Sequence, residues 1–382
     1  MWIQTRGLTD GRYVGAVDEI GTELASLARL ASQSHPIDFI DSLPHQLETV
    51  IDTIDVGLYD LQRRQLISLR DGKPVDPDQW PVSVAVEHHG NHLGRLLVKP
   101  AEDDDNVVAS VLQVLAPLVA LNITSAFDFD DRPWTTIRTN EMSLAAEIQA
   151  TVVPPPSCRR RDYAISAAVE PAYETGGDIF EYSFDDDRLF LAVLDAMGHG
   201  LSAALLASLA TAALRRARRE GDGLADVVGH VDTAVRAQHN GSAFVSAVMV
   251  EIDVNTGRCQ WVSAGHLPPL LLSEGNVREL TTEPSLPLGL WVTGDEEPDD
   301  VPVNELTLEP DESLVLYSDG IIENLMESSE DHIGDDRFRE AVGSHARMFT
   351  HRCARDVVEE LLKASGSSLR DDATLLIAHR ST

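Results

Sequence analysis

The sequence predicts an α+β protein with two folded parts, a smaller one first and a larger one in the second half. Three observations support this. Helical and β-prone runs are mixed along the whole chain, a polar acidic break at 128–133 ends in proline, and several apolar runs of the second half begin or end at an Asp. The length of 382 residues allows two or three domains, and a hydrophobic content of 43% suffices for ordinary cores.

The first part combines helices with a small antiparallel sheet. Apolar spacing predicts helices over 17–30 and 37–51 and strands over 56–61, 82–86 and 93–98, with a hairpin turn at 88–92. The stretch 107–123 is apolar but is interrupted by polar residues and a proline. Because a membrane span needs about 20 mostly apolar residues, this stretch predicts a buried helix instead.

A connecting helix is predicted from Thr136 to Val152, and it ends before three consecutive prolines at 154–156. The expected boundaries are therefore 1–126 for the first part, 127–156 for a linker with the connecting helix, and 157–382 for the second part. Apolar residues on this helix could form the seam of a homodimer or pack on the second part, and the sequence leaves both alternatives open: Met142, Leu144, Ile148 and Val152.

The second part alternates strands and turns around a few helices. Apolar runs predict strands at 189–194, 244–252, 259–263, 313–318 and 373–378, and a hairpin turn at 255–257. Helical spacing predicts helices at 201–219, 224–238 and 353–363. The basic run 215–219 closes the first of these helices, where cations complement the helix dipole. The acidic segments 295–300 and 327–336 are expected to be exposed loops.

Charge and cysteine usage restrict the possible partners and compartment. Against 30 Lys and Arg stand 63 Asp and Glu, a formal charge of −33, which argues against nucleic acid or an anionic membrane as partner. The three cysteines are far apart and form no Cys-x-x-Cys spacing, so neither a disulfide framework nor a zinc cluster is expected. With an N-terminus that lacks the apolar core of a signal peptide, these features suit the cytoplasm.

Four carboxylate positions follow one another along the second part, and most of them lie where an apolar run begins or ends: Asp178, Asp195, Asp319 and the pair Asp371-Asp372. Strands that stop at an Asp deliver it to one rim of a sheet, and several carboxylates on one rim repel each other. Such a cluster is tolerable only if cations neutralise it or if some groups stay protonated. Oxygen ligands alone favour Mg²⁺ or Mn²⁺ over zinc.

Together, these segments resemble the SpoIIE-type bacterial branch of the metal-dependent protein phosphatases, the PPM family. The resemblance covers about 148–380 and rests on an ordered set of motifs: Gln149 to Pro154, Gly176-Gly177-Asp178, Asp195 to Gly200, Phe244-Val245-Ser246, Ser263 to Pro269, Leu316 to Gly320 and Asp371 to Leu376. It implies a two-sheet β-sandwich flanked by helices, with two Mn²⁺ or Mg²⁺ ions at one end and phosphoserine or phosphothreonine in a protein as substrate.

The resemblance also assigns the metal ligands. It implies that Asp178 and Asp195 lie closest to both ions, with the backbone carbonyl of Ala196 beside them. Asp319 and Asp371 would complete the second ion, and Asp372 would support a ligand or replace one. Two such ions can activate a water for attack on phosphorus, so no nucleophilic Ser, Cys or His is required.

Two positions near these motifs are considered separately: one departs from the family pattern, and the other has two alternative roles. Many members of the family have Asp three residues after the Gly-Gly-Asp carboxylate, whereas this chain has Glu181. His199 precedes a helix, where it could orient a ligand loop by hydrogen bonding or transfer a proton; the first role is favoured.

The first part resembles a GAF-type sensory domain over about 40–125, with a PAS-like or a purely structural module as alternatives. The resemblance therefore implies a cytoplasmic protein phosphatase that a sensory module controls through the connecting helix. Its expected partner is a phosphorylated STAS-type anti-anti-sigma factor, and a small ligand of the first part is left open. The alternatives are a non-catalytic phosphoprotein-binding regulator and a hydrolase of small phosphoesters, and the latter is disfavoured because the chain has no Gly-rich nucleotide cradle.

Overall fold

The computed structural model describes the following residues: 54–60, 65–68, 71–88, 91–99, 105–129, 143–170, 176–239, 242–291, 301–324, 333–345, 349, 353–365 and 371–381. The helices expected at 17–30 and 37–51 and the acidic segment 295–300 lie outside them. Of the break expected at 128–133, the first two residues are helical instead and the rest lies outside the described residues. The chain divides into two compact units, Met1–Glu141 and Met142–Thr382, which are described separately here.

The first unit contains a five-stranded antiparallel sheet. Its strands lie in the order β3 (Pro74–Val75), β2 (Gln65–Ser68), β1 (Ile54–Asp60), β5 (Asn91–Val98) and β4 (Val82–His88). The pairing of β4 with β5 confirms the predicted hairpin. Helix α3 (Asp105–Phe129) packs on β4 and β5 with a buried stripe at helical spacing: Val108, Leu112, Leu115, Val119 and Ile123. The predicted buried helix is thus confirmed, and no helix in the described ranges has the length and hydropathy to span a membrane.

Two antiparallel sheets make up most of the second unit. The five-stranded sheet has the order β14 (Asn304–Thr307), β11 (Arg258–Ala264), β10 (Val245–Asp253), β9 (Arg188–Ala196) and β8 (Asp178–Asp185). The six-stranded sheet has the order β13 (Asn276–Glu279), β12 (Leu270–Ser273), β15 (Ser313–Tyr317), β16 (Ala373–Arg380), β7 (Tyr163–Glu170) and β6 (Ser157–Arg160).

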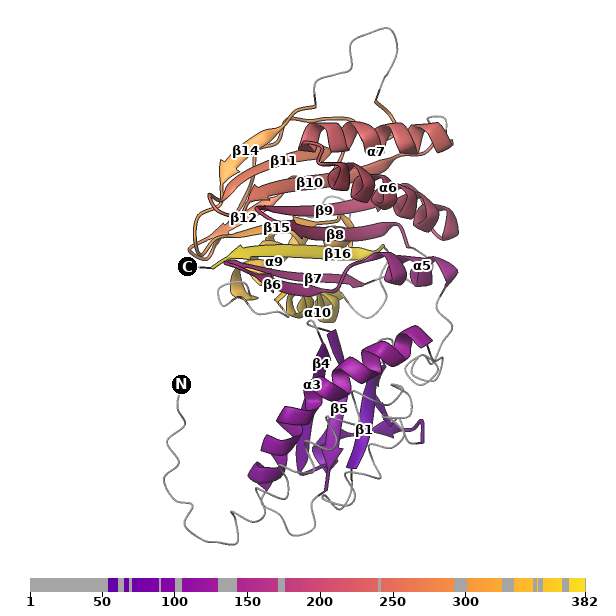
Figure 1. The fold of residues 1–382 in the computed structure, drawn as a ribbon, viewed down its shortest axis with the longest axis vertical. Helices are drawn as coiled ribbons and strands as arrows, with labels where there is room; N and C mark the ends of the chain where they lie inside the picture. The colour runs from indigo at the N-terminus through magenta and orange to yellow at the C-terminus, as the bar shows by residue number, and fades with distance from the viewer. Residues whose placement is uncertain are drawn as a thin grey trace. The chain divides into compact units, whose positions relative to one another are not determined.

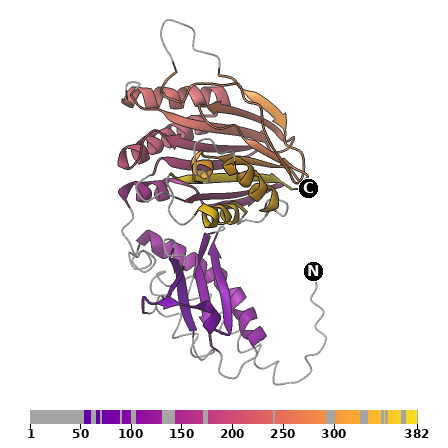
Figure 2. The ribbon, with the colours of Figure 1, turned by 180° about the vertical axis from the view of Figure 1, so that it is seen from behind.

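The sheets stack face to face and helices cover both outer faces (Figures 1 and 2). The core between the sheets takes Phe180 and Leu191 from one sheet and Ile165 and Leu376 from the other. Helices α6 (Leu201–Glu220) and α7 (Leu224–His239) cover the five-stranded sheet, and α9 (Ile333–His345) and α10 (Cys353–Ser365) cover the six-stranded one. The expected two-sheet sandwich flanked by helices is therefore confirmed.

Most predicted elements of this unit are found, with one correction. Helices α6, α7 and α10 match the three predicted helices, and β10 and β11 pair across the predicted turn at 255–257. The acidic segment 327–336 was expected to be a loop, but α9 begins within it at Ile333 and carries Asp335 and Asp336 in its first turn. Carboxylates stabilise the positive N-terminal end of a helix, so this acidic composition belongs to a helix start.

Candidate metal centre

Asp178 and Asp195 face each other across neighbouring strands. Asp178 begins β8, Asp195 is the last residue but one of β9, and the two are direct partners in the antiparallel register. Successive side chains of a strand point to opposite faces of the sheet. Phe180 and Val193 lie in the core between the sheets, whereas Ile179 and Leu194 pack under α6 and α7. By this alternation Asp178 and Asp195 both point into the end of the sandwich.

The second sheet brings its acidic residues to the same end. Asp319 follows β15 and Asp371-Asp372 precede β16, and these two strands pair so that Tyr317 lies opposite Leu375. The antiparallel register therefore places the end of β15 beside the start of β16. Asn324 fixes this rim, because its side-chain amide donates to the carbonyls of Gly320 and Asp371 at 2.6 and 2.9 Å.

Asp372 lies where the ends of the two sheets come together, and it is 2% exposed. The Asp178 N–H points at Asp372 Oδ2 over 3.5 Å, at the limit of a hydrogen bond. A Cβ atom on Gly320 would collide with the carbonyl of Asp372. Gly320 is thus required because the backbone packs closely there. It lies beside the acidic rim, the group of carboxylates formed by Asp178, Asp195, Asp319, Asp371 and Asp372.

The carboxylates at this rim raise one another's pKa values. Burial, then Asp195 and Asp372, raise the pKa of Asp178 well above its ordinary value. Burial raises the pKa of Asp195 to about 7, with contributions from Asp319, Asp371 and Asp372. Burial and Asp371 also raise the pKa of Asp319. Bound cations would offset this mutual repulsion and favour the ionised carboxylates.

The residues fit a hard divalent cation on two counts. Asp178 Oδ2 is buried and accepts no hydrogen bond from the described residues, and a bound cation would satisfy this oxygen. The gathered donors are carboxylate oxygens, the ligands that Mg²⁺ and Mn²⁺ prefer. The structure thus brings together all five predicted Asp residues, and Ala196 directly follows Asp195 at the end of β9. Their assignment as metal ligands remains a prediction.

Glu181 takes no part in this site. It points to the opposite face of β8, is 3% exposed and binds Arg215 of α6 through its Oε2 atom at 2.6 Å. The departure from the family pattern therefore affects the support of α6 rather than the acidic rim. His199 is exposed and forms no hydrogen bond within the described part of the chain, so its expected hydrogen-bonding role is not seen.

Two residues of the site were missed from the sequence. Glu323 lies on α8 (Gly320–Glu323), and burial together with Asp319 and Asp371 raises its pKa. Its spacing of four residues from Asp319 is a helical signal that could have found it. The second is Gln149 on α5 (Leu144–Val152), which is buried against Asp178 and Asp372. The sequence analysis placed Gln149 at the start of a family motif but assigned it no role in the site.

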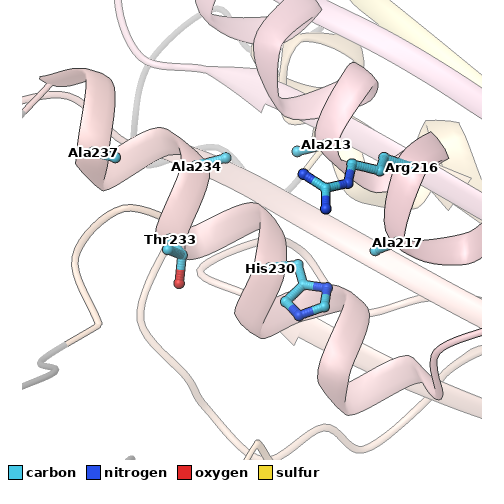
Figure 3. Close-up of a pocket in the computed structure, with 7 residues that line it drawn as sticks. All are labelled: Ala213, Arg216, Ala217, His230, Thr233, Ala234 and Ala237. Atoms are coloured by element: carbon cyan, nitrogen blue, oxygen red, sulfur yellow. The ribbon is translucent and has the colours of Figure 1, made fainter. Parts of the chain in front are cut away.

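A separate hollow of about 320 Å³ lies between α6 and α7 (Figure 3). Alanines form most of its wall, and Arg216, His230 and Thr233 supply its polar groups; the lining residues are Ala213, Arg216, Ala217, His230, Thr233, Ala234 and Ala237. None of the predicted metal ligands lines it. The acidic rim and this hollow are therefore different places on the second unit.

Comparison with known proteins gives a consistent relationship over the second unit. A family model described as Stage II sporulation protein E (SpoIIE) matches residues 185–381. The chain is 24% identical over 241 residues to phosphoserine phosphatase RsbU of Bacillus subtilis (strain 168), an alignment that covers 63% of this chain and 70% of RsbU. It is 27% identical over 188 residues to phosphoserine phosphatase RsbP of the same organism, covering 48% of this chain and 45% of RsbP.

The fold has a solved counterpart. A crystal structure of the RsbU and RsbW domains of a Mycobacterium tuberculosis protein is similar, with a TM-score of 0.52 and 28% identity. The match covers 60% of this chain and 63% of that one, so this chain spans less than two thirds of the solved protein.

Proposed function

The chain belongs to the SpoIIE family of protein phosphatases, and we propose that its second unit hydrolyses phosphoserine or phosphothreonine in a regulatory protein. One observation carries this proposal. Five aspartates from two sheets converge at one end of the sandwich, and a buried oxygen of Asp178 there accepts no hydrogen bond from the part of the chain that the structure describes. Such an arrangement is suited to divalent cations and has no evident structural use without them.

We assign the ions to the residues that the family resemblance implies. Asp178 and Asp195 would lie between two Mn²⁺ or Mg²⁺ ions with the Ala196 carbonyl, Asp319 and Asp371 would complete the second ion, and Asp372 would support them. When bound, the ions supply Lewis acidity toward the phosphoryl oxygens and lower the pKa of the attacking water. The chain's own contribution is to hold five carboxylates at fixed positions on strand ends, so that little reorganisation is needed.

The cysteines do not offer an alternative nucleophile. Burial raises the pKa values of Cys259 and Cys353 to about 12, and burial also raises the pKa of Cys158. Since the thiolate is the reactive form, these three thiols are unreactive near neutral pH. A cysteine-dependent phosphatase mechanism is therefore disfavoured, which agrees with hydrolysis by an activated water.

The partner is proposed from the family resemblance together with the chain's charge. RsbU and RsbP are phosphoserine phosphatases, which supports a phosphorylated protein as the substrate class. Within that class we propose a STAS-type anti-anti-sigma factor, with control by the N-terminal unit through the connecting helix predicted from Thr136 to Val152, which includes α5. A formal charge of −33 argues against nucleic acid as partner.

The direct test is phosphate release from a panel of serine-phosphorylated regulatory proteins with Mn²⁺. We expect activity in the wild-type chain and a loss of more than about 100-fold in Asp195→Ala, because even partners behind the ligands are worth about 10–100-fold. Asp186→Asn is the matched control. Asp186 is an exposed carboxylate at the β8–β9 turn, at the opposite end of the same strands.

Two results would count against this function. Absence of phosphate release from every phosphoprotein, with Asp195→Ala indistinguishable from wild type, would favour the non-catalytic phosphoprotein-binding alternative. Equal losses of activity in Asp195→Ala and Asp186→Asn would mean that the loss of any carboxylate on this hairpin perturbs the enzyme. The acidic rim would then have no specific role in catalysis.

A further inference from the structure

Helix α5 lies directly against the acidic rim. It begins after Ser143, whose side chain accepts a hydrogen bond from the Ala146 N–H at 3.2 Å, and it ends at Val152 before the prolines at 154–156. Its buried residues are Ala145, Ala146 and Gln149. A glutamine on the buried face of a nine-residue helix requires hydrogen-bond partners, because burial of an unpaired amide is unfavourable.

Both partners of Gln149 belong to the proposed metal centre. Its side chain is 2% exposed, and its Nε2 donates to the Asp178 carbonyl at 2.7 Å and to Asp372 Oδ2 at 3.2 Å. An amide NH₂ group has two hydrogens, so both donors of Gln149 are used. One amide thus joins the strand that carries Asp178 to the segment that carries Asp372, across the two sheets.

The position of α5 is fixed by two further contacts. A Cβ atom on Gly176, two residues before Asp178, would lie 2.9 Å from the carbonyl carbon and oxygen of Ala145. This is too close for any other residue, so the helix backbone rests directly on the Gly-Gly-Asp segment. At the other end, Arg215 of α6 donates to the Val152 carbonyl at 2.6 Å. Both ends of the helix that carries Gln149 are therefore in direct contact with the rest of the second unit.

We propose that Gln149 is a positioning residue of the metal centre, which holds the Asp372 carboxylate and the backbone of Asp178 in the arrangement that the ions require. This inference rests on the proposed function. Hydrogen bonds from a second residue orient a ligand or its neighbour, and their loss typically weakens metal binding by about 10–100-fold. Without Gln149, the buried Asp372 carboxylate would lose one of its hydrogen-bond donors, and such a loss is costly where water cannot replace the donor.

The proposal is tested by replacing the amide donor in the full-length chain. Gln149→Met keeps the length and the helix propensity of the side chain but removes the donor. Gln149→Asn keeps an amide but shortens the side chain by one methylene, so the amide is withdrawn from its partners. We expect calorimetric titration of the metal-free protein to give a dissociation constant for Mn²⁺ at least about 10-fold higher in both variants.

Kinetics and a control variant on the same helix distinguish a role in positioning the metal ligands from a role in fold stability alone. At saturating Mn²⁺ the KM for the phosphoprotein should stay unchanged, while the Mn²⁺ concentration for half-maximal activity rises with the dissociation constant. Thr151→Ala is the control, because Thr151 is exposed and its hydroxyl donates only to the Ile148 carbonyl within α5. It should bind Mn²⁺ as the wild type does.

The outcomes separate this inference from the proposed function. Wild-type affinity for Mn²⁺ in a folded Gln149→Met variant would overturn it, as would an equal loss in Thr151→Ala. If Gln149→Met does not fold, the same comparison with Gln149→Asn decides. If the wild-type chain binds no Mn²⁺ and releases no phosphate, the proposed function itself fails and the inference fails with it.

Discussion

His266 lies half-buried after β11 and forms hydrogen bonds with two strands of different sheets. Its Nδ1 lies 2.8 Å from Ser246 Oγ and its Nε2 lies 3.1 Å from the Tyr317 carbonyl. A carbonyl only accepts, so Nε2 carries the proton and Nδ1 accepts from the Ser246 hydroxyl. Ser246 is the cross-strand neighbour of Asp195, and Tyr317 precedes Asp319 by two residues. The neutral ring therefore ties the two sheets together beside the acidic rim.

This geometry predicts a pH-dependent contribution of His266 to stability. Burial lowers its pKa to about 4, against about 6.5 when the chain is unfolded. The unfolded state thus binds the proton first, so the contribution is fully present above about pH 6.5 and is lost as the pH falls toward 4. The linked change is roughly 3 kcal/mol. Urea unfolding should show wild type losing its advantage over His266→Gln between pH 7.5 and pH 4.5.

The same comparison can contradict the assignment. A difference in the free energy of unfolding between wild type and His266→Gln that stays constant from pH 7.5 to pH 4.5 would mean that the ring is not held neutral. Because both proteins share the acidic rim, the titration of its carboxylates cancels in this difference.

At the scale of single residues, the sequence identified the acidic site but not its support. Asp178, Asp195, Asp319, Asp371 and Asp372 could be predicted, because each lies within a family motif and most of them lie where an apolar run begins or ends. The partners of these residues could not. The hydrogen bonds of Gln149 to Asp178 and Asp372 join residues 29 and 223 positions apart, a relation that only the folded chain creates.

Arg215 connects helix α6 to the elements that pack against it. Arg215 binds Glu181 Oε2 through Nη2 and Nε at 2.6 and 3.0 Å, and it also donates to the end of α5. Glu181 has a side-chain exposure of only 4%, so it would keep a buried charge if the arginine were removed. The pair therefore joins β8, α5 and α6 behind the acidic rim.

Removal of this arginine should destabilise the second unit. We expect Arg215→Met to lower the free energy of unfolding by about 3 kcal/mol, because it leaves Glu181 unpaired. The double variant Arg215→Met with Glu181→Leu should recover much of that loss, because it removes the buried charge as well. The control is Arg216→Met on the next position of α6. Arg216 pairs with Glu220 at the surface, and its loss should cost no more than about 0.5 kcal/mol. Equal losses in Arg215→Met and Arg216→Met, measured by urea unfolding, would contradict the buried role.

At the scale of elements, local patterns predicted the long helices and the apolar strands. Helices α6 and α7 have apolar residues at helical spacing, and β9, β15 and β16 are nearly continuous apolar runs. The strands β12, β13 and β14, of four residues each, were not predicted, and neither were the longer strands β7 and β8. The short strands exist because a partner strand completes their backbone hydrogen bonds, as β11 does for β14.

At the scale of the whole molecule, the chain joins two compact units, and the first element of the second unit is also part of its proposed metal centre. The acidic break and the prolines indicated separate parts, but they could not assign α5 to one of them. That assignment follows from Gln149 and Gly176, which place the helix against the Asp178 segment. The identification of the first unit as a GAF-like module stays a prediction.

The central claim is that the acidic rim of the second unit is a two-ion centre. Calorimetric titration of the metal-free full chain with Mn²⁺, beside Asp195→Ala, counts the ions directly. We expect two Mn²⁺ ions per wild-type chain and weaker binding with a lower stoichiometry in Asp195→Ala. Absence of saturable binding in the wild type, or binding that Asp195→Ala leaves unchanged, would contradict it.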